Sequence, residues 1–155
     1  MVNIFAREIT DELTSLVKQL DATVGKNKKM QMRGFVVLLT EDPDADEEKL
    51  KALAKKHGIK NIPLTLYDGI AGPEKYKVTE DAAVTVMLWR GQSVVVNHAF
   101  AKGKLDKKAI KAIVADTKKI LKPAPKKKKE KKSKTDKKKT DKKPAKKSDK
   151  KPEKK

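Results

Sequence analysis

The sequence predicts an α/β domain over residues 1–121, with a mixed sheet and helices on both faces of the sheet, followed by a disordered tail over residues 122–155. Two observations predict the domain. Short apolar runs of strand length alternate with segments of helical periodicity, and the last two strand-like runs flank a tight turn. Early parallel units and a late hairpin together give a mixed sheet. A run of lysines without large apolar residues predicts the tail.

The chain is expected to begin with a strand, a helix and a second strand. Residues 2–6 form the first strand, and the helix begins after Thr10, a residue type that serves well as an N-cap. Residues 35–39 are continuously apolar, which is typical of a strand covered on both faces. The apolar residues of the helix fall on one helical face, namely Leu13, Leu16, Val17, Leu20 and Val24.

The acidic stretch at residues 42–48 opens the second helix. We expect Asp44 or Asp46 to be its N-cap, with the other carboxylates favourable in the first turn. Gly58 ends this helix. The stretch lacks the glycine and the twelve-residue spacing of a calcium-binding EF-hand loop, so it is interpreted as a helix start and not as a cation site.

The second half of the domain is expected to contain a strand, a hairpin and a last helix. The strand covers residues 62–67, where Pro63 suits its first residues or a sheet edge. One helical turn follows before the hairpin strands at residues 84–89 and 93–100. The last helix is expected at residues 106–121, and its inward residues are Ile110, Ile113, Val114, Thr117 and Ile120.

This order resembles the thioredoxin fold, in the redoxin branch of peroxiredoxin-like and thiol-disulfide-oxidoreductase-like domains. The resemblance covers about residues 2–121. Its best-matched part is "AVTVMLWRGQSVVVNHAFAKGKLDKKAIKAIV", a strand, a tight turn, a strand and the final helix. The stretch "LAKKHGIKNIPLTLYDGIAGPEKYKV" is similar to the redoxin insertion before the hairpin. The resemblance implies a thioredoxin-like sheet with the element order βαβα-β-ββα.

The residues that carry thiol chemistry in that family are missing here. The family keeps a C-x-x-C motif or a peroxidatic cysteine where the first strand meets the first helix, at the place of Thr10 to Leu13. It keeps a cis-proline before the hairpin, at the place of Val84 after Ala83. A cis bond before a non-proline residue costs about 2.5–4 kcal/mol, so a trans bond is expected. Thr10, Leu13, Ala83 and Val84 are therefore degenerate positions of a redox site, without assigned activity.

The composition excludes several classes of site. Because the chain contains no cysteine, disulfides, zinc thiolates and thiol catalysis are excluded for it. His57 and His98 are far apart and are interpreted as structural, so no metal or other cofactor is expected. No apolar run is long enough to be an integral membrane segment, and a cytoplasmic location is expected. A strand that begins at Val2 leaves open a leader or a motif upstream of Met1.

The tail holds most of the charge. Residues 126–155 contain 18 lysines and 5 acidic residues, so about +13 of the formal net charge of +19 lies there. Its composition is similar to that of linker-histone tails, and the alternatives are polyanion binding and a merely solubilising role. As a partner of the tail, an anionic membrane surface is less favoured than nucleic acid. The lysines expected to contact a polyanion are Lys126, Lys127, Lys128, Lys129, Lys131, Lys132, Lys137, Lys138, Lys139, Lys142, Lys143, Lys146 and Lys147.

Two functions of different classes remain open at the level of sequence. In the first, a non-enzymatic thioredoxin-like domain acts as an interaction module with a protein partner, and its polybasic tail associates with nucleic acid or another polyanion regardless of sequence. In the second, the chain is the body of a redoxin-type thiol oxidoreductase whose catalytic cysteines lie upstream of Met1. The reading frame before Met1 discriminates between them.

Overall fold

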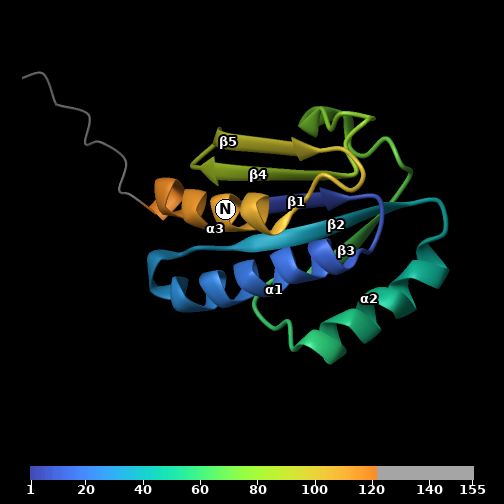
Figure 1. The fold of residues 1–155 in the computed structure, drawn as a ribbon, viewed down its shortest axis with the longest axis horizontal. Helices are drawn as coiled ribbons and strands as arrows, with labels where there is room; N and C mark the ends of the chain where they lie inside the picture. The colour runs from blue at the N-terminus through green and yellow to red at the C-terminus, as the bar shows by residue number, and fades with distance from the viewer. Residues whose placement is uncertain (122–155) are drawn as a thin grey trace, which may run out of the picture. The chain divides into compact units, whose positions relative to one another are not determined.

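The computed structural model describes residues 1–121, so the predicted disordered tail lies outside the described residues. Those residues form a five-stranded mixed sheet with three α-helices, which confirms the α/β class (Figure 1). Each predicted strand and helix is present. In chain order the elements are β1 (Val2–Ala6), α1 (Asp11–Lys26), the 3-10 turn η1 (Lys28–Met30), β2 (Gly34–Thr40), α2 (Pro43–His57), β3 (Leu64–Asp68), the 3-10 turn η2 (Glu74–Tyr76), β4 (Val84–Arg90), β5 (Ser93–Phe100) and α3 (Lys107–Leu121).

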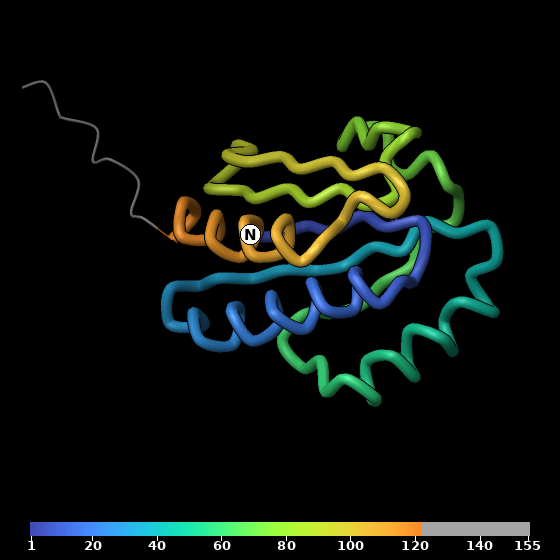
Figure 2. Tube along the Cα trace, viewed as in Figure 1, coloured from blue at the N-terminus to red at the C-terminus, as the bar shows by residue number. Residues whose placement is uncertain are grey.

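The strands lie in the order β3-β2-β1-β4-β5. The first three run parallel to one another, while β4 is antiparallel to both β1 and β5. β1 is therefore the central strand, and Figure 2 shows it between β2 and β4. All five residues of β1 are buried because the sheet is covered on both sides. β3 and β5 are the two edges, and the edge position of β3 agrees with Pro63 immediately before it.

All three helices cover the same face of the sheet, which corrects the expectation of helices on both faces. α1 contacts both α2 and α3, and Figure 1 shows it between them. One core cluster joins Leu16 of α1, Leu50 of α2 and Ile113 of α3 to Ile4 and Val86 of the sheet. The reason is topological. The two parallel crossovers step in the same direction across the sheet, and right-handed crossovers in one direction place their helices, α1 and α2, on one side. α3 follows β5 and packs against α1 on that same side.

The opposite face of the sheet is covered by the connection between β3 and β4, residues 69–83, which we call the β3–β4 segment. A second apolar cluster lies there, and it contains no α-helical residue. Tyr76 of η2 lies over it, with its ring centroid 5.0 Å from that of Phe5 and 6.0 Å from that of Trp89. This face therefore depends on a segment whose only regular structure is one short 3-10 turn.

One of the two predicted N-caps is confirmed and the other is wrong. The Thr10 hydroxyl caps α1, and the five apolar residues predicted for the inner face of α1 are all buried. The predicted N-cap of α2 is wrong, because Asp42 fills that role and accepts a hydrogen bond from the Ala45 amide at 3.1 Å. Pro43 explains the difference, since its fixed φ and missing N–H suit the first helical position and place the cap one residue earlier.

The connection from α2 to β3 is fastened to α1 by one buried carboxylate. Asp21 accepts hydrogen bonds from the backbone amides of Lys60, Asn61 and Ile62 at 3.1, 2.6 and 2.9 Å. The Asn61 side chain adds a fourth bond at 2.9 Å. A Cβ atom on Gly25 would meet that side-chain nitrogen at 2.9 Å, so a larger residue there would displace the Asn61 side chain from its present position.

Candidate functional site

A recess of about 210 Å³ lies where β1 ends, α1 begins and β4 starts. Three of the four degenerate redox positions line it, although Thr10 is more than 70 residues from Ala83 and Val84 in the chain. The fourth, Leu13, is 3% exposed and belongs to the helix-side core. The lining residues are Glu8, Thr10, Glu12, Ala83, Val84, Ala101, Lys102, Gly103 and Leu105.

Sheet pairing brings the two distant sides of the recess together. Val84, the first residue of β4, pairs with Ala6, the last residue of β1. One residue further on, the Arg7 amide donates to the Ala83 carbonyl oxygen at 3.0 Å. Ala83 and Val84 are thereby held against the start of α1, and they give the recess a small apolar wall.

Thr10 contributes to the recess as a helix cap. Its hydroxyl oxygen accepts from the Leu13 amide at 3.1 Å, and its carbonyl oxygen accepts from the Thr14 amide and hydroxyl at 2.9 Å each. No carboxylate or imidazole accepts a hydrogen bond from the Thr10 hydroxyl among the described contacts, so no base activates it as a nucleophile. The hydroxyl is a structural group with one proton left to donate.

Replacing Thr10 by alanine should lower the free energy of unfolding by about 1 kcal/mol, because the Leu13 amide loses its capping acceptor. Replacement by serine should change the free energy by only a few tenths of a kcal/mol, because serine keeps the hydroxyl. Urea unfolding followed by circular dichroism measures both. Equal losses in the two variants would show that the methyl group and not the cap matters at this position.

An exposed ion pair closes one side of the recess. The Lys102 amine lies 2.6 Å from the Glu8 carboxylate, and both side chains are largely in solvent. Lys102 belongs to a turn that Gly103 makes with a φ of 72°, a conformation that favours glycine. Leu105, two residues after Gly103, is buried and packs into the helix-side core beneath the recess.

The polar groups of the recess are of several kinds. The recess offers carboxylates, one amine, a hydroxyl and a small apolar wall. It holds no thiol, because the chain has none. Within residues 1–121, no group of three or more histidine, aspartate or glutamate side chains is close enough to hold a metal ion. The recess therefore offers a small polar group ionic and hydrogen-bonding partners, but no thiol.

The two histidines lie away from this recess. His98 faces the helix side of β5, where its Nε2 lies 3.0 Å from a carboxylate oxygen of Asp116 on α3. Lys119 lies 2.7 Å from the other oxygen of Asp116. The hydrogen bond from Lys119 lowers the pKa of Asp116 most, burial opposes this, and the hydrogen bond from His98 adds to the lowering. His57 ends α2 and is half-buried.

The sequence did not predict a role for Asp116 or Arg7. Asp116 is the partner of His98, and the only sequence feature that indicates an inward position for it is its spacing of three residues from the inward Ile113. Arg7 fastens the β3–β4 segment through three backbone carbonyl groups. The sequence feature that distinguishes Arg7 is that it is one of only three arginines in a lysine-rich chain. The predicted polyanion-binding lysines all lie outside the described residues.

Within residues 1–121 no helix is both long and apolar enough to cross a bilayer. Comparison with known proteins provides no further constraint on the site. No family model, curated protein sequence or solved structure matches this chain.

Proposed function

We propose that this chain is a thioredoxin-like interaction module without thiol chemistry, and that its lysine-rich residues 122–155 bind nucleic acid or another polyanion through phosphate contacts. The observation that carries the proposal is the charge asymmetry. About +13 of the net charge of +19 lies in residues 126–155, whereas the first 120 or so residues hold about +5. Lysine is a compact point charge that attracts phosphates without reading bases, so the binding is independent of sequence.

The thioredoxin-like part of the proposal rests on arrangement. A parallel β1-α1-β2 unit is followed by an antiparallel β4-β5 hairpin and a helix that packs beside α1. The recess lies at the β1–α1 junction against the start of β4, which is where that family holds its cysteines and its cis-proline. The position of α2 on the same face as α1 and α3 departs from the family pattern.

Salt dependence of DNA binding tests the role of the lysine-rich residues. If about 8 lysines each neutralise one phosphate, log K should fall with log[salt] with a slope of about −7. Fluorescence anisotropy with two DNA duplexes of equal length and unrelated sequence measures the slope. We expect equal affinities for the two duplexes, and no measurable binding by a chain that ends at Leu121.

A charge-reduced variant is the matched control for length. Replacing the six lysines at residues 126–132 by glutamine removes a third of the lysines in residues 126–155 and keeps the chain length. The slope should then change from about −7 to about −5. Equal DNA affinity of the full chain and the chain ending at Leu121 at low salt would contradict the proposal.

The recess favours one second candidate, a redoxin-type oxidoreductase whose cysteines are supplied from upstream of Met1. A space of about 210 Å³ beside Thr10, Ala83 and Val84 could admit a substrate next to such a thiol. Assays of disulfide reduction and peroxide turnover should be negative for the chain as written. A chain extended by its in-frame upstream sequence should be active only under the second candidate.

A further inference from the structure

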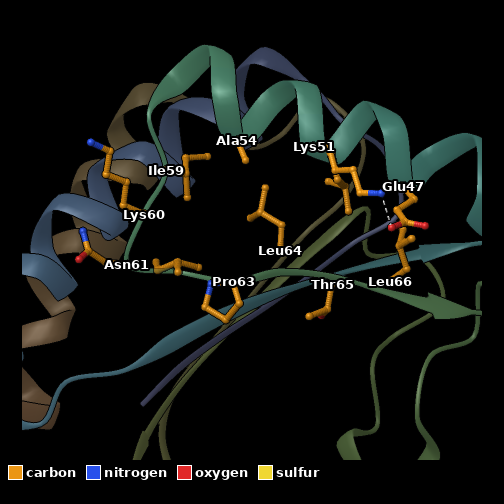
Figure 3. Close-up of a pocket in the computed structure, with 12 residues that line it drawn as sticks. Glu47, Lys51, Ala54, Ile59, Lys60, Asn61, Pro63, Leu64, Thr65 and Leu66 are labelled. Carbon is orange, nitrogen blue, oxygen red and sulfur yellow. Dashed lines mark ion pairs between the residues drawn. The ribbon is translucent and has the colours of Figure 1, made fainter.

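A groove of about 560 Å³ runs between α2 and the edge strand β3, on the opposite side of α1 from α3. Figure 3 shows Leu64 pointing from β3 into the space beneath Ala54 and Ile59. Lys60 lies at one end of the groove, and Glu47 and Lys51 lie at the other. The groove is separate from the recess at the β1–α1 junction, and the two share no lining residue.

The backbone of β3 is unpaired along this groove. The Val36 amide donates to the Pro63 carbonyl at 3.0 Å, and the Gly69 amide donates to the Thr40 carbonyl at 2.7 Å. In a parallel ladder the bonded residues alternate, so the odd-numbered residues of β3 pair with β2 and the even-numbered ones face away from it. No other strand among residues 1–121 borders that side. Leu64, Leu66 and Asp68 therefore present free N–H and C=O groups to the edge.

The side chains beside this edge form an apolar floor. Leu64 and Leu66 turn to the helix face of the sheet and are only half-buried, although both are large and apolar. Leu50 of α2 and Ile62 are buried beneath them. The floor is preformed, because the four hydrogen bonds to Asp21 hold residues 60–62 in place. A strand that pairs with β3 would place every second side chain on this floor.

The charges that line the groove favour a partner with a negative charge. The Lys51 amine lies 2.6 Å from the Glu47 carboxylate, so these two charges compensate each other. Lys60 is exposed at the opposite end and forms no ion pair with any residue from 1 to 121. The groove thus carries one uncompensated positive charge. Residues 126–155 fit it poorly, since they hold 18 lysines and no apolar residue larger than alanine or proline.

We propose that this groove binds an extended peptide segment of a protein partner, which adds a sixth strand beside β3. The segment has apolar side chains at alternate positions and a carboxylate that reaches Lys60. Main-chain hydrogen bonds to Leu64 and Leu66 provide affinity, and the apolar floor and Lys60 provide selectivity, as in other cases of strand addition beside a helix.

A peptide titration of the full 155-residue chain tests this site. The probe is an octapeptide of alternating threonine and valine with a C-terminal aspartate. In ¹⁵N NMR spectra we expect saturable shifts at the amides of Leu64, Leu66 and Asp68. The same peptide with alternate backbone nitrogens methylated cannot pair with an edge and should bind at least tenfold more weakly.

Charge reversal tests the selectivity. Lys60→Glu should weaken binding of the aspartate peptide about fivefold and strengthen binding of a peptide that ends in lysine amide. Lys56→Glu makes the same change on α2 outside the groove lining and should alter affinity less than twofold. Both lysines are exposed, so the melting temperatures should remain close to that of the parent chain.

Several results would overturn the proposal. These are the absence of saturable shifts on β3, equal binding of the methylated peptide, and equal effects of the two charge reversals. Shifts confined to the lysines of residues 122–155 would report the polyanion interaction of the proposed function and would count against the groove. Dimerisation in sedimentation runs that abolishes peptide binding would assign the edge to a second copy of the chain.

Discussion

Asp21→Ala should lower the free energy of unfolding by about 3–5 kcal/mol at pH 7, the largest loss that we expect from one substitution outside the apolar core. The carboxylate accepts three backbone amides of the α2–β3 connection at distances from 2.6 to 3.1 Å. Alanine leaves these donors without an acceptor, and the Ile62 amide is fully buried. Asp21→Asn keeps one acceptor oxygen but loses the charge, so its loss should be smaller, about 1–2 kcal/mol.

The same carboxylate should make stability depend on acid. Burial by itself raises the pKa of Asp21, but the hydrogen bonds from Asn61, Ile62 and Lys60 outweigh it and hold the pKa below the ordinary value of 3.8. The folded state therefore binds the proton less readily than the unfolded state does. The stabilisation is fully present above pH 3.8 and is lost as the pH falls through the lower folded-state pKa.

Urea unfolding of the parent chain and both variants between pH 7 and pH 2 measures these effects. Asp21→Asn should show a flatter dependence of stability on pH in the acid range. Asp11→Asn is the matched control, since Asp11 is exposed in the first turn of the same helix, and its loss should stay below about 1 kcal/mol. A loss below 1 kcal/mol for Asp21→Ala, or an unchanged acid limb in Asp21→Asn, would contradict the assigned role.

Arg7→Ala should release the β3–β4 segment from the sheet and lower the free energy of unfolding by about 2–4 kcal/mol. The guanidinium donates to the carbonyl oxygens of Ile70 and Thr79 at 3.0 and 3.1 Å and also to that of Ala82. One planar fork thus joins both ends of the segment to the end of β1. Lysine has a single ammonium group that cannot span these acceptors, so Arg7→Lys should recover less than half of the loss.

The face beneath the segment makes it prone to open. Buried polar atoms of Asn3, Thr85 and Trp89 on that face have no hydrogen-bond partner within the described part of the chain. Such atoms weaken packing against the sheet, because water would satisfy them once the segment lifts. Arg7 therefore supplies hydrogen bonds that the face itself does not.

Trp89 reports the opening, because it is the only tryptophan and lies against Tyr76. In Arg7→Ala, its emission should shift to longer wavelength, and amide exchange in residues 69–83 should accelerate before that of β1. Arg33→Ala removes an exposed arginine and should leave both readouts unchanged. Uniform acceleration of exchange across the whole sheet would show that Arg7 supports global stability and does not act as a local latch.

Local patterns in the sequence were enough to predict the elements and part of the site. The spacing of the five apolar residues from Leu13 to Val24 predicts both α1 and the face that it buries. Thr10 acts as the expected cap, and Gly58 ends α2 in the left-handed conformation. The resemblance assigned Thr10, Leu13, Ala83 and Val84 to one degenerate site. Thr10, Ala83 and Val84 line the recess, whereas Leu13 is buried in the helix-side core.

The sequence by itself determined the order of strands and helices, the N-cap of α1 and the buried face of α1, because each of these depends on residues within a few positions of one another. Only the tertiary structure decided which side of the sheet the helices cover, since a periodic apolar face does not say where its partner lies. It also decided the Asp21 network, which joins residues 39 to 41 positions apart, and the contacts of Arg7, which reach 63 to 75 positions along the chain. Such hydrogen bonds join residues that only the folded chain brings together, so no local pattern indicates them.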